Sequence, residues 1–290
     1  MNIRGKNMTL ASLTGFAWLT GGLTMSGLAA MAAPAGAERL TVPLTDPSKP
    51  AVIEVSLVSG SIRVKGTATK DVIIEARSAE EVDEREHEPG ERHEERDRQG
   101  MRRIPNTALG LSAEEEDNRV SISAESWNRE IDISIEVPAG SRLELSTVNG
   151  GDIEVENVHG ELDLHNTNGE IHVKDVKGPV SASTVNGDVS VVFTSAMVAA
   201  PMAFSTLNGD VDVTLPASLK ADVRLRSDNG EIYSDFEIAM NSTKPEIEEK
   251  REGGKYRLVV AREMTGKIQG GGPELFLKTF NGDILLRRKG

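Results

Sequence analysis

An acidic residue follows each of six Asn-Gly pairs, and a row of such carboxylates could bind a hard cation. The six acids are Asp152, Glu170, Asp188, Asp210, Glu231 and Asp283. If their segments stack as neighbouring strands, the carboxylates form a column spaced by about 4.8 Å, and calcium prefers such oxygen ligands. Calcium-binding β-roll repeats carry Gly-Gly-x-Gly-x-Asp in each turn, and the phrase here lacks the second glycine pair. The pattern favours solvated turn acids, with a calcium column along the first five as the alternative.

The other residue types with catalytic potential form no recognisable constellation. His159 falls at a corner, and His165 and His172 fall on the polar side of an alternating pattern, which favours surface roles over zinc binding or general-base catalysis. The sequence contains no G-x-S-x-G elbow, no phosphate loop ending in Lys-Ser or Lys-Thr, and no H-E-x-x-H motif. We therefore expect no catalytic residue, no cofactor and no enzymatic activity.

The acids belong to a repeated phrase that predicts two strands around a corner. The copies read LELSTVNGGDIEV, LDLHNTNGEIHV, VSASTVNGDVSV, MAFSTLNGDVDV, VRLRSDNGEIYS and LFLKTFNGDILL. The positions four and six residues before each asparagine are apolar, and apolar residues alternate again after the acid. This period of two is typical of strands with one buried face.

Asn-Gly suits the corner for backbone reasons, because glycine enters positive φ without penalty and asparagine tolerates it better than most residues. The predicted structural turn residues are Asn149, Gly150, Asn168, Gly169, Asn186, Gly187, Asn208, Gly209, Asn229, Gly230, Asn281 and Gly282.

The spacing of the corners predicts the architecture. Successive asparagines lie 19, 18, 22, 21 and 52 residues apart, and a period near 20 residues indicates stacked coils. We predict an all-β chain forming a single elongated β-solenoid, β-helix-like, with about 20 residues per coil and a polar insertion. An antiparallel meander folded into a sandwich or barrel is the alternative.

The repeated phrase S-T-φ-N-G-D-φ-x-φ, where φ is apolar, resembles the bacterial β-strand-repeat domain family of unknown function that is labelled "putative adhesin". The similarity covers about residues 120–288, with a weaker echo near residues 56–64. The phrase is a structural signature and carries no catalytic residues. The resemblance implies a β-solenoid outside the cytoplasm, with a role in adhesion.

Residues 1–37 read as a signal peptide. Arg4 and Lys6 give a positive start, residues 8–32 are uncharged and largely apolar or small, and Ala35-Gly36-Ala37 is a cleavage motif. A transmembrane anchor is the alternative, since the segment is long enough to span a bilayer. We expect export to the periplasm or cell surface, with no membrane span after cleavage.

The rest of the chain divides by composition. Residues 38–79 read as N-terminal strands or a cap, and residues 120–290 as the repeat domain. Between them, residues 80–119 form a charged insertion with 14 acids and 6 arginines from Glu80 to Asp117. This composition predicts disorder, with a partner-binding loop as the alternative.

Charge narrows the set of partners. The formal net charge is −13, and residues 1–37 hold two basic and no acidic residues, so the remainder carries −15. Such a chain is repelled by nucleic acid and by anionic membranes. We expect an exported, non-enzymatic scaffold that binds an envelope or surface partner, plausibly in adhesion. The alternatives are a polysaccharide-active enzyme, a lyase or hydrolase on a β-helix, and a sensory module of an envelope-stress system.

Overall fold

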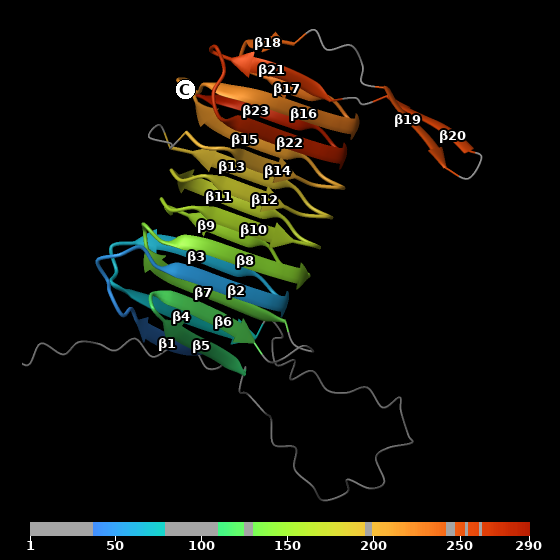
Figure 1. The fold of residues 1–290 in the computed structure, drawn as a ribbon. Coiled ribbons are helices and arrows are strands. Elements are labelled where there is room, and N and C mark those ends of the chain that lie inside the picture. Colours follow the sequence, from blue (N-terminus) through green and yellow to red (C-terminus); the bar gives the residue numbers. More distant parts are fainter. Residues whose placement is uncertain are drawn as a thin grey trace, which may run out of the picture. The chain divides into compact units, whose positions relative to one another are not determined.

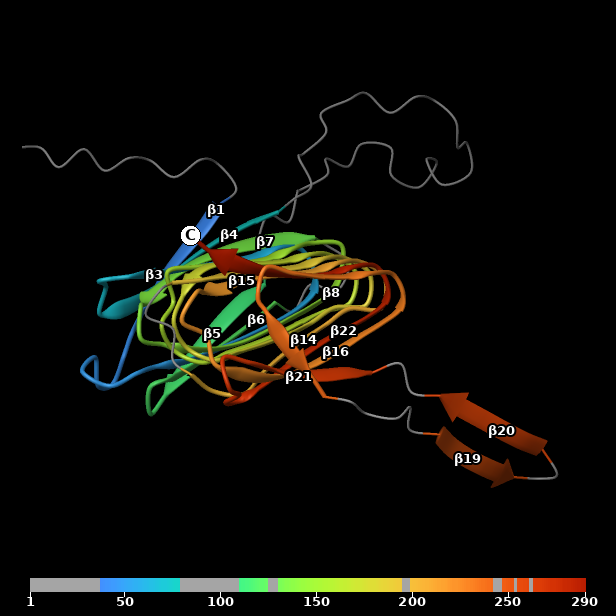
Figure 2. The same ribbon diagram turned by 90° about the horizontal axis from the view of Figure 1, so that it is seen from above.

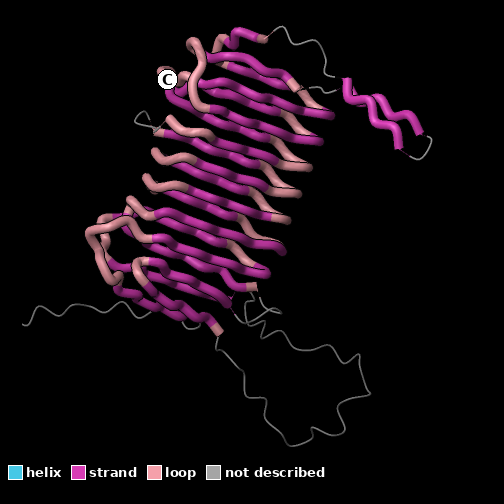
Figure 3. The backbone as a smooth tube through the Cα atoms, viewed as in Figure 1, coloured by secondary structure: helices cyan, strands magenta, loops and turns pink. Residues whose placement is uncertain are grey.

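The computed structural model describes residues 37–78, 110–124, 130–194, 199–241, 247–252, 255–260 and 263–290. These residues form strands and connecting turns (Figure 3). No helix in these ranges is long and apolar enough to cross a membrane. The predicted signal segment and most of the charged insertion lie outside the described residues.

Two large sheets contain most of the strands (Figure 1). Sheet A has ten strands, in the order β1 (Ala37–Pro43), β4 (Asp71–Ser78), β7 (Ile131–Pro138), β3 (Ile62–Thr67), β9 (Ile153–Glu156), β11 (Ile171–Val176), β13 (Val189–Phe193), β15 (Val211–Pro216), β23 (Ile284–Lys289) and β17 (Ile232–Ser234). Sheet B has eleven, in the order β18 (Ile238–Met240), β21 (Met264–Ile268), β16 (Ala221–Asn229), β22 (Glu274–Asn281), β14 (Met202–Ser205), β12 (Val180–Ser183), β10 (Leu162–Asn166), β8 (Arg142–Asn149), β2 (Val52–Ser59), β6 (Arg119–Ala124) and β5 (Leu111–Glu116). A separate two-stranded sheet pairs β19 (Ile247–Glu252) with β20 (Lys255–Val260).

In the central repeats the chain passes from one sheet to the other at each corner. It runs from β8 in sheet B to β9 in sheet A, then to β10 in sheet B and β11 in sheet A. Figure 2 shows the strands of the two sheets facing each other across this stack. Strands of successive repeats pair in parallel and without a register shift over β8, β10 and β12. Equivalent residues of the phrase therefore become lateral neighbours.

The core lies between the two sheets. The alternate apolar residues of the phrase point inward and form one buried cluster that both sheets contribute to. Phe193 of β13 packs edge-to-face on Phe204 of β14, with ring centroids 6.5 Å apart and an interplanar angle of 77°. Because these strands belong to different sheets, the aromatic pair joins the two layers.

The prediction of a single β-solenoid is wrong, because the chain forms two large mixed sheets of ten and eleven strands. Spatial order departs from sequence order twice. The strand β2 pairs with β8 on one side and with β6 on the other. Likewise, β3 pairs with β9 on one side and with β7 on the other. The last phrase, β22 and β23, lies between the fourth and fifth copies. The meander alternative also fails, since the central strands pair in parallel.

Antiparallel strands close both ends of sheet B and one end of sheet A. At one end β1 pairs with β4 and β4 with β7 in sheet A, and β5 pairs with β6 in sheet B. At the other end β21 of sheet B pairs with both β16 and β18, whereas sheet A ends in β17, which is parallel to β23. A parallel stack leaves unpaired edge groups at each end, and the antiparallel strands cover those of the parallel strands beside them.

The strand β5 lies within the range predicted as a disordered insertion. Its residues Leu111–Glu116 alternate between half-buried and exposed positions, and Glu114 and Glu116 lie on the exposed side. Acids on an edge strand reduce pairing with other chains. The acid count that suggested disorder therefore reflects the polar face of an edge strand in this part of the segment.

Candidate functional site

The Asn-Gly corners lie on one edge of the molecule, where sheet B strands end and sheet A strands begin. We call this surface the turn edge and define it as the five to six residues from two positions before each asparagine to the following acid, together with Val58 at the equivalent Ser59-Gly60 corner. Asn149, Asn229 and Asn281 are the last residues of β8, β16 and β22, and the other three asparagines lie just after their strands. Parallel pairing brings equivalent side chains of the corners into rows, which are described one by one.

The row two residues before the asparagines fastens each corner to its neighbour. The hydroxyl of Thr206, for example, donates a 2.8 Å hydrogen bond to the backbone carbonyl of Gly187. Asn166 makes the equivalent bond to Gly151 through its side-chain amide, at 2.9 Å. The full row is Thr147, Asn166, Thr184, Thr206, Ser227 and Thr279. All but Ser227 are buried, so these bonds pair side-chain donors that are largely shielded from water.

The asparagines themselves form a side-chain ladder. The amide Nδ2 of Asn186 donates to Oδ1 of Asn168 at 2.8 Å, and that of Asn208 donates to Asn186 at 2.7 Å. Asn281 continues the ladder onto Asn208 at 2.7 Å, and Asn229 onto Asn281 at 3.0 Å. None of the six corner asparagines has a positive φ, so the left-handed preference expected from the sequence does not explain them. The ladder gives them another role, a lateral bond between repeats.

The acid row behaves mainly as a set of hydrogen-bond acceptors. Oδ1 of Asp152 accepts the backbone N–H of Glu170 at 2.8 Å, and Asp188 accepts that of Asp210 at 2.7 Å. In the same way, Oδ1 of Asp210 accepts the backbone N–H of Asp283, and Oδ1 of Asp283 accepts that of Glu231. Among the described residues, no group of three or more His, Cys, Asp or Glu side chains is placed to hold a metal ion. Calcium binding along this row stays a prediction.

An exposed apolar row runs immediately before the asparagines and before Ser59 of the equivalent corner after β2. It comprises Val58, Val148, Val185, Leu207 and Phe280, whose exposed fractions lie between 39% and 45%. These residues lie in, or just after, the strands β2, β8, β12, β14 and β22, which belong to one continuous run of six neighbours. The sixth strand, β10, is followed by Thr167 at the equivalent position. At about 4.8 Å per strand, the row extends for about 24 Å.

The turn edge therefore carries an apolar row, an amide row and an acidic row side by side. The family model of Toastrack DUF4097 matches residues 5–269 of this chain. The chain belongs to the Toastrack DUF4097 family. This confirms the resemblance to a domain family of unknown function that the repeated phrase indicated.

One solved structure similar to this Toastrack chain is a "putative cell adhesion protein" from Clostridium sporogenes ATCC 15579. The two share 13% sequence identity, the comparison covers 87% of this chain and 100% of the other, and the TM-score is 0.47. No curated protein matches the sequence.

The outward face of sheet A in the Toastrack chain holds a groove of 590 Å³ with alternating charge. Arg63 and Lys65 of β3 lie beside Glu154 and Glu156 of β9, in register. The ion pairs Arg63–Glu154 and Lys65–Glu156 measure 3.3 and 3.4 Å. The strand β11 adds Lys174 next to Glu156. Each carboxylate of β9 therefore already faces a cation.

The outward face of sheet B holds a smaller groove of 380 Å³ around an arginine. Arg224 lies between Glu263 and Glu274, at 2.7 and 2.8 Å, and its guanidinium covers the ring of Phe276 at 5.1 Å. The hydrogen bond from Arg224 lowers the pKa of the Glu263 carboxyl, with burial opposing it. A cation held by two acids and a ring is a structural anchor for the antiparallel end.

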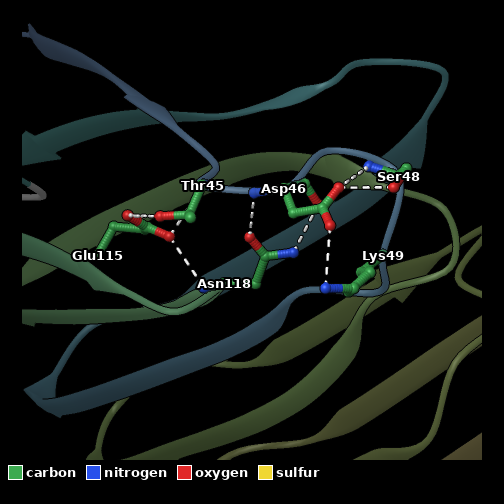
Figure 4. A network of polar contacts seen from close by, with 6 residues as sticks. All are labelled: Thr45, Asp46, Ser48, Lys49, Glu115 and Asn118. Carbon is green, nitrogen blue, oxygen red and sulfur yellow. Dashed lines mark hydrogen bonds and ion pairs between the residues drawn. The ribbon is translucent and has the colours of Figure 1, made fainter.

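A polar network at the opposite end joins a loop to the turn between β5 and β6 (Figure 4). The Asn118 side chain accepts the N–H of Asp46 and donates to its carbonyl, both at 2.7 Å. Glu115 accepts the N–H and hydroxyl of Thr45, each at 3.1 Å. Hydrogen bonds from Ser48 and Lys49 lower the pKa of the Asp46 carboxyl to about 2.

The three histidines of the repeats lie at surface or half-buried positions. His172 contacts Glu170 at 2.7 Å, and His165 contacts Asp163 at 3.1 Å. Burial, followed by the charge of Lys177, lowers the pKa of His159. These pairings are local to each repeat and bring no two of the histidines together as ligands.

Sequence reasoning identified the corners and the acids but missed two rows of the turn edge. It assigned no role to the buried Thr, Asn and Ser positions or to the exposed apolar positions. Both can be seen when the six copies are aligned on their asparagines. The first is a column with a hydroxyl or amide in every copy, where the alternation predicts a buried residue. The second column is apolar in four of the six copies, where the alternation predicts an exposed residue.

Proposed function

We propose that the chain is an exported, non-enzymatic binding module of the bacterial envelope that engages a protein partner in adhesion through its turn edge. The observation that carries this proposal is the exposed apolar row. Five large apolar side chains lie in or just after five of six neighbouring strands, and each is about two-fifths exposed. Exposed apolar side chains gathered in one row mark interaction sites more often than isolated residues do.

The rigidity of the turn edge supports this role. The buried hydroxyl row and the asparagine ladder fix each corner to its neighbours. A surface that is ordered before binding loses little conformational entropy on association.

The acidic row defines the chemistry of the partner. Asp152, Asp188, Asp210 and Asp283 form no ion pair with a described residue. A partner with apolar side chains flanked by Lys or Arg would cover the apolar row and compensate these charges. The net negative charge of the chain disfavours nucleic acid and anionic membranes as partners.

The test compares two triple variants in binding to intact cells and to purified envelope proteins of the producing bacterium. The first variant, Val185→Ser with Leu207→Ser and Phe280→Ser, removes the centre of the apolar row. The matched control, Ile73→Ser with Val192→Ser and Leu285→Ser, removes half-buried apolar side chains from the outward face of sheet A. We expect the first variant to lose binding by about tenfold or more and the control to keep it.

The melting temperature of each variant separates a binding defect from a folding defect. Equal binding by the wild type and the first triple variant, with both folded, would overturn the proposal. Cell binding that persists both in high salt and in the first variant would also overturn it, because the acidic row predicts that salt weakens binding to the partner.

The groove on sheet A favours a second candidate, a polysaccharide-active face. It brings Glu154 and Glu156 together with Arg63, Lys65 and Lys174, which are residue types that bind and cleave acidic polysaccharides. Incubation with acidic polysaccharides, followed by assays for reducing ends and unsaturated products, tests this candidate. Turnover that disappears in Glu154→Gln would support it over the binding module.

A further inference from the structure

Five of the six Asn-Gly pairs are held by the ladder, and one is not. We propose that Asn149 is the site of spontaneous deamidation in this protein, through cyclisation with Gly150. The exposed side chain of Asn149 forms no hydrogen bond with a described residue. The ladder ends one step earlier, since Nδ2 of Asn168 donates to the backbone carbonyl of Val148 at 3.1 Å.

An additional glycine explains why Asn149 is excluded from the ladder. The first copy reads Asn-Gly-Gly-Asp where the others read Asn-Gly followed directly by the acid. In this copy Gly151 lies against the backbone of Gly60 and takes the position that Gly187 and Gly209 occupy in their own repeats. A Cβ on Gly150 would meet no atom within 4 Å, and the residue has a φ of 50°. Gly150 is therefore the additional residue at this corner, while the backbone of Asn149 stays paired with Ser59 of β2.

The reaction requires a free side chain and a free backbone nitrogen. The nitrogen of Gly150 attacks Cγ of Asn149, the bond from Cγ to Nδ2 breaks, and ammonia leaves with the proton of the attacking nitrogen. Water then hydrolyses the cyclic imide at either carbonyl and yields aspartate or isoaspartate. Glycine in the second position exposes the attacking nitrogen, because it has no side chain.

The ladder pairs lack this freedom. The N–H groups of Gly169, Gly187 and Gly209 each donate to an asparagine carbonyl of the neighbouring repeat, at 2.9 Å. The amide groups of the preceding asparagines are also engaged. Cyclisation at these three corners must first break a side-chain bond and a backbone bond. At Asn229 and Asn281 it must first break the side-chain amide bond. Gly150 donates no backbone hydrogen bond within the described ranges.

The product would change the turn edge. A carboxylate at position 149 places a new negative charge beside Val148 at one end of the apolar row, and isoaspartate also lengthens the backbone by one methylene. Deamidation at this corner would thus alter one end of the surface proposed to bind a partner, although the chemistry does not depend on that proposal.

The test follows all six asparagines by peptide mass spectrometry while the full chain is incubated at mildly alkaline pH. In the native protein we expect Asn149 to convert about tenfold faster than the ladder asparagines, since each of those must first break one or two hydrogen bonds. In denaturant the six rates should converge, because every site has the same Asn-Gly sequence.

Deletion of Gly150 supplies a matched control. It restores the spacing of Asn186-Gly187-Asp188 and should bring Asn149 into the ladder, so its rate should fall to that of the other five. Native rates that are equal at all six sites would overturn the proposal. A native Asn149 that stays fast after the deletion, in a variant with wild-type melting temperature, would contradict the explanation by the additional glycine.

Discussion

The side-chain amide of Asn208 donates a 2.7 Å hydrogen bond to Oδ1 of Asn186, a residue 22 positions earlier in the chain. Asn186 in turn donates to Asn168, so a central ladder asparagine is both donor and acceptor. The bonds run in the same direction as the backbone pairing between repeats. The ladder therefore adds to cohesion between repeats where the chain leaves the sheets.

Asn186→Ala tests the contribution of the ladder to stability. The substitution removes one donor and one acceptor, and the amide of Asn208 loses its partner. Because these groups are exposed and can bond to water, we expect a loss of about 1 kcal/mol in the free energy of unfolding. Denaturant unfolding of the wild type and the variant measures this loss.

Asn149→Ala is the control for that experiment. It removes an asparagine from an equivalent sequence position outside the ladder, and we expect a change within about 0.5 kcal/mol. Equal losses in the two variants would show that the effect comes from the corner conformation and not from the ladder.

The repeated phrase was sufficient to predict strands, their buried faces and the corners between them. Each of these depends on local properties: period-two alternation around residues such as Leu143 and Leu145, and the backbone freedom of the glycines at the corners. Both residues are buried, as the alternation requires. The family resemblance rested on the same phrase and is confirmed.

The arrangement of the repeats could not be read in the same way. A local pattern determines that a strand has a buried face but not which strand covers its edges. The gap of 52 residues between Asn229 and Asn281 hid the return of β22 to a place between β14 and β16. The antiparallel end strands carry no Asn-Gly signal, so two mixed sheets were mistaken for one solenoid.

Asn166→Thr should stabilise the chain. Asn166 occupies a row in which four of the six residues are threonine, and its Oδ1 atom is buried without a hydrogen-bond partner. A threonine hydroxyl can donate to the Gly151 carbonyl as Thr184 does to Gly169, and it removes the unsatisfied oxygen. We expect the free energy of unfolding, measured with denaturant, to rise by about 1 kcal/mol. A fall would show that the second hydrogen bond of the Asn166 amide, to the Glu170 carbonyl, contributes more than the unsatisfied oxygen costs.

Gly209→Ala should be among the most damaging single changes at the turn edge. Gly209 has a φ of 149°, and a Cβ there would overlap the carbonyl of Gly187. Steric overlap and backbone strain together predict a loss of about 3 kcal/mol or more. Gly150→Ala is the matched comparison, since a Cβ there meets open space. Only the left-handed φ then destabilises the variant, by about 1 kcal/mol. Similar melting temperatures for the two variants would contradict the close packing at Gly209.

The network around Asp46 predicts an acid-sensitive contribution to stability. Its pKa is lowered from 3.8 to about 2, chiefly by the Ser48 hydroxyl and then by Lys49. A lowered folded pKa means that the stabilisation is fully present above pH 3.8 and is lost as the pH falls through about 2. The difference in melting temperature between the wild type and Asp46→Asn should therefore be constant near neutral pH and shrink across that interval. Ser48→Ala removes the strongest hydrogen-bond donor to Asp46, so the loss of stability should begin at higher pH in this variant. A difference in melting temperature between the wild type and Asp46→Asn that stays constant down to pH 2 would refute the role of the Asp46 charge.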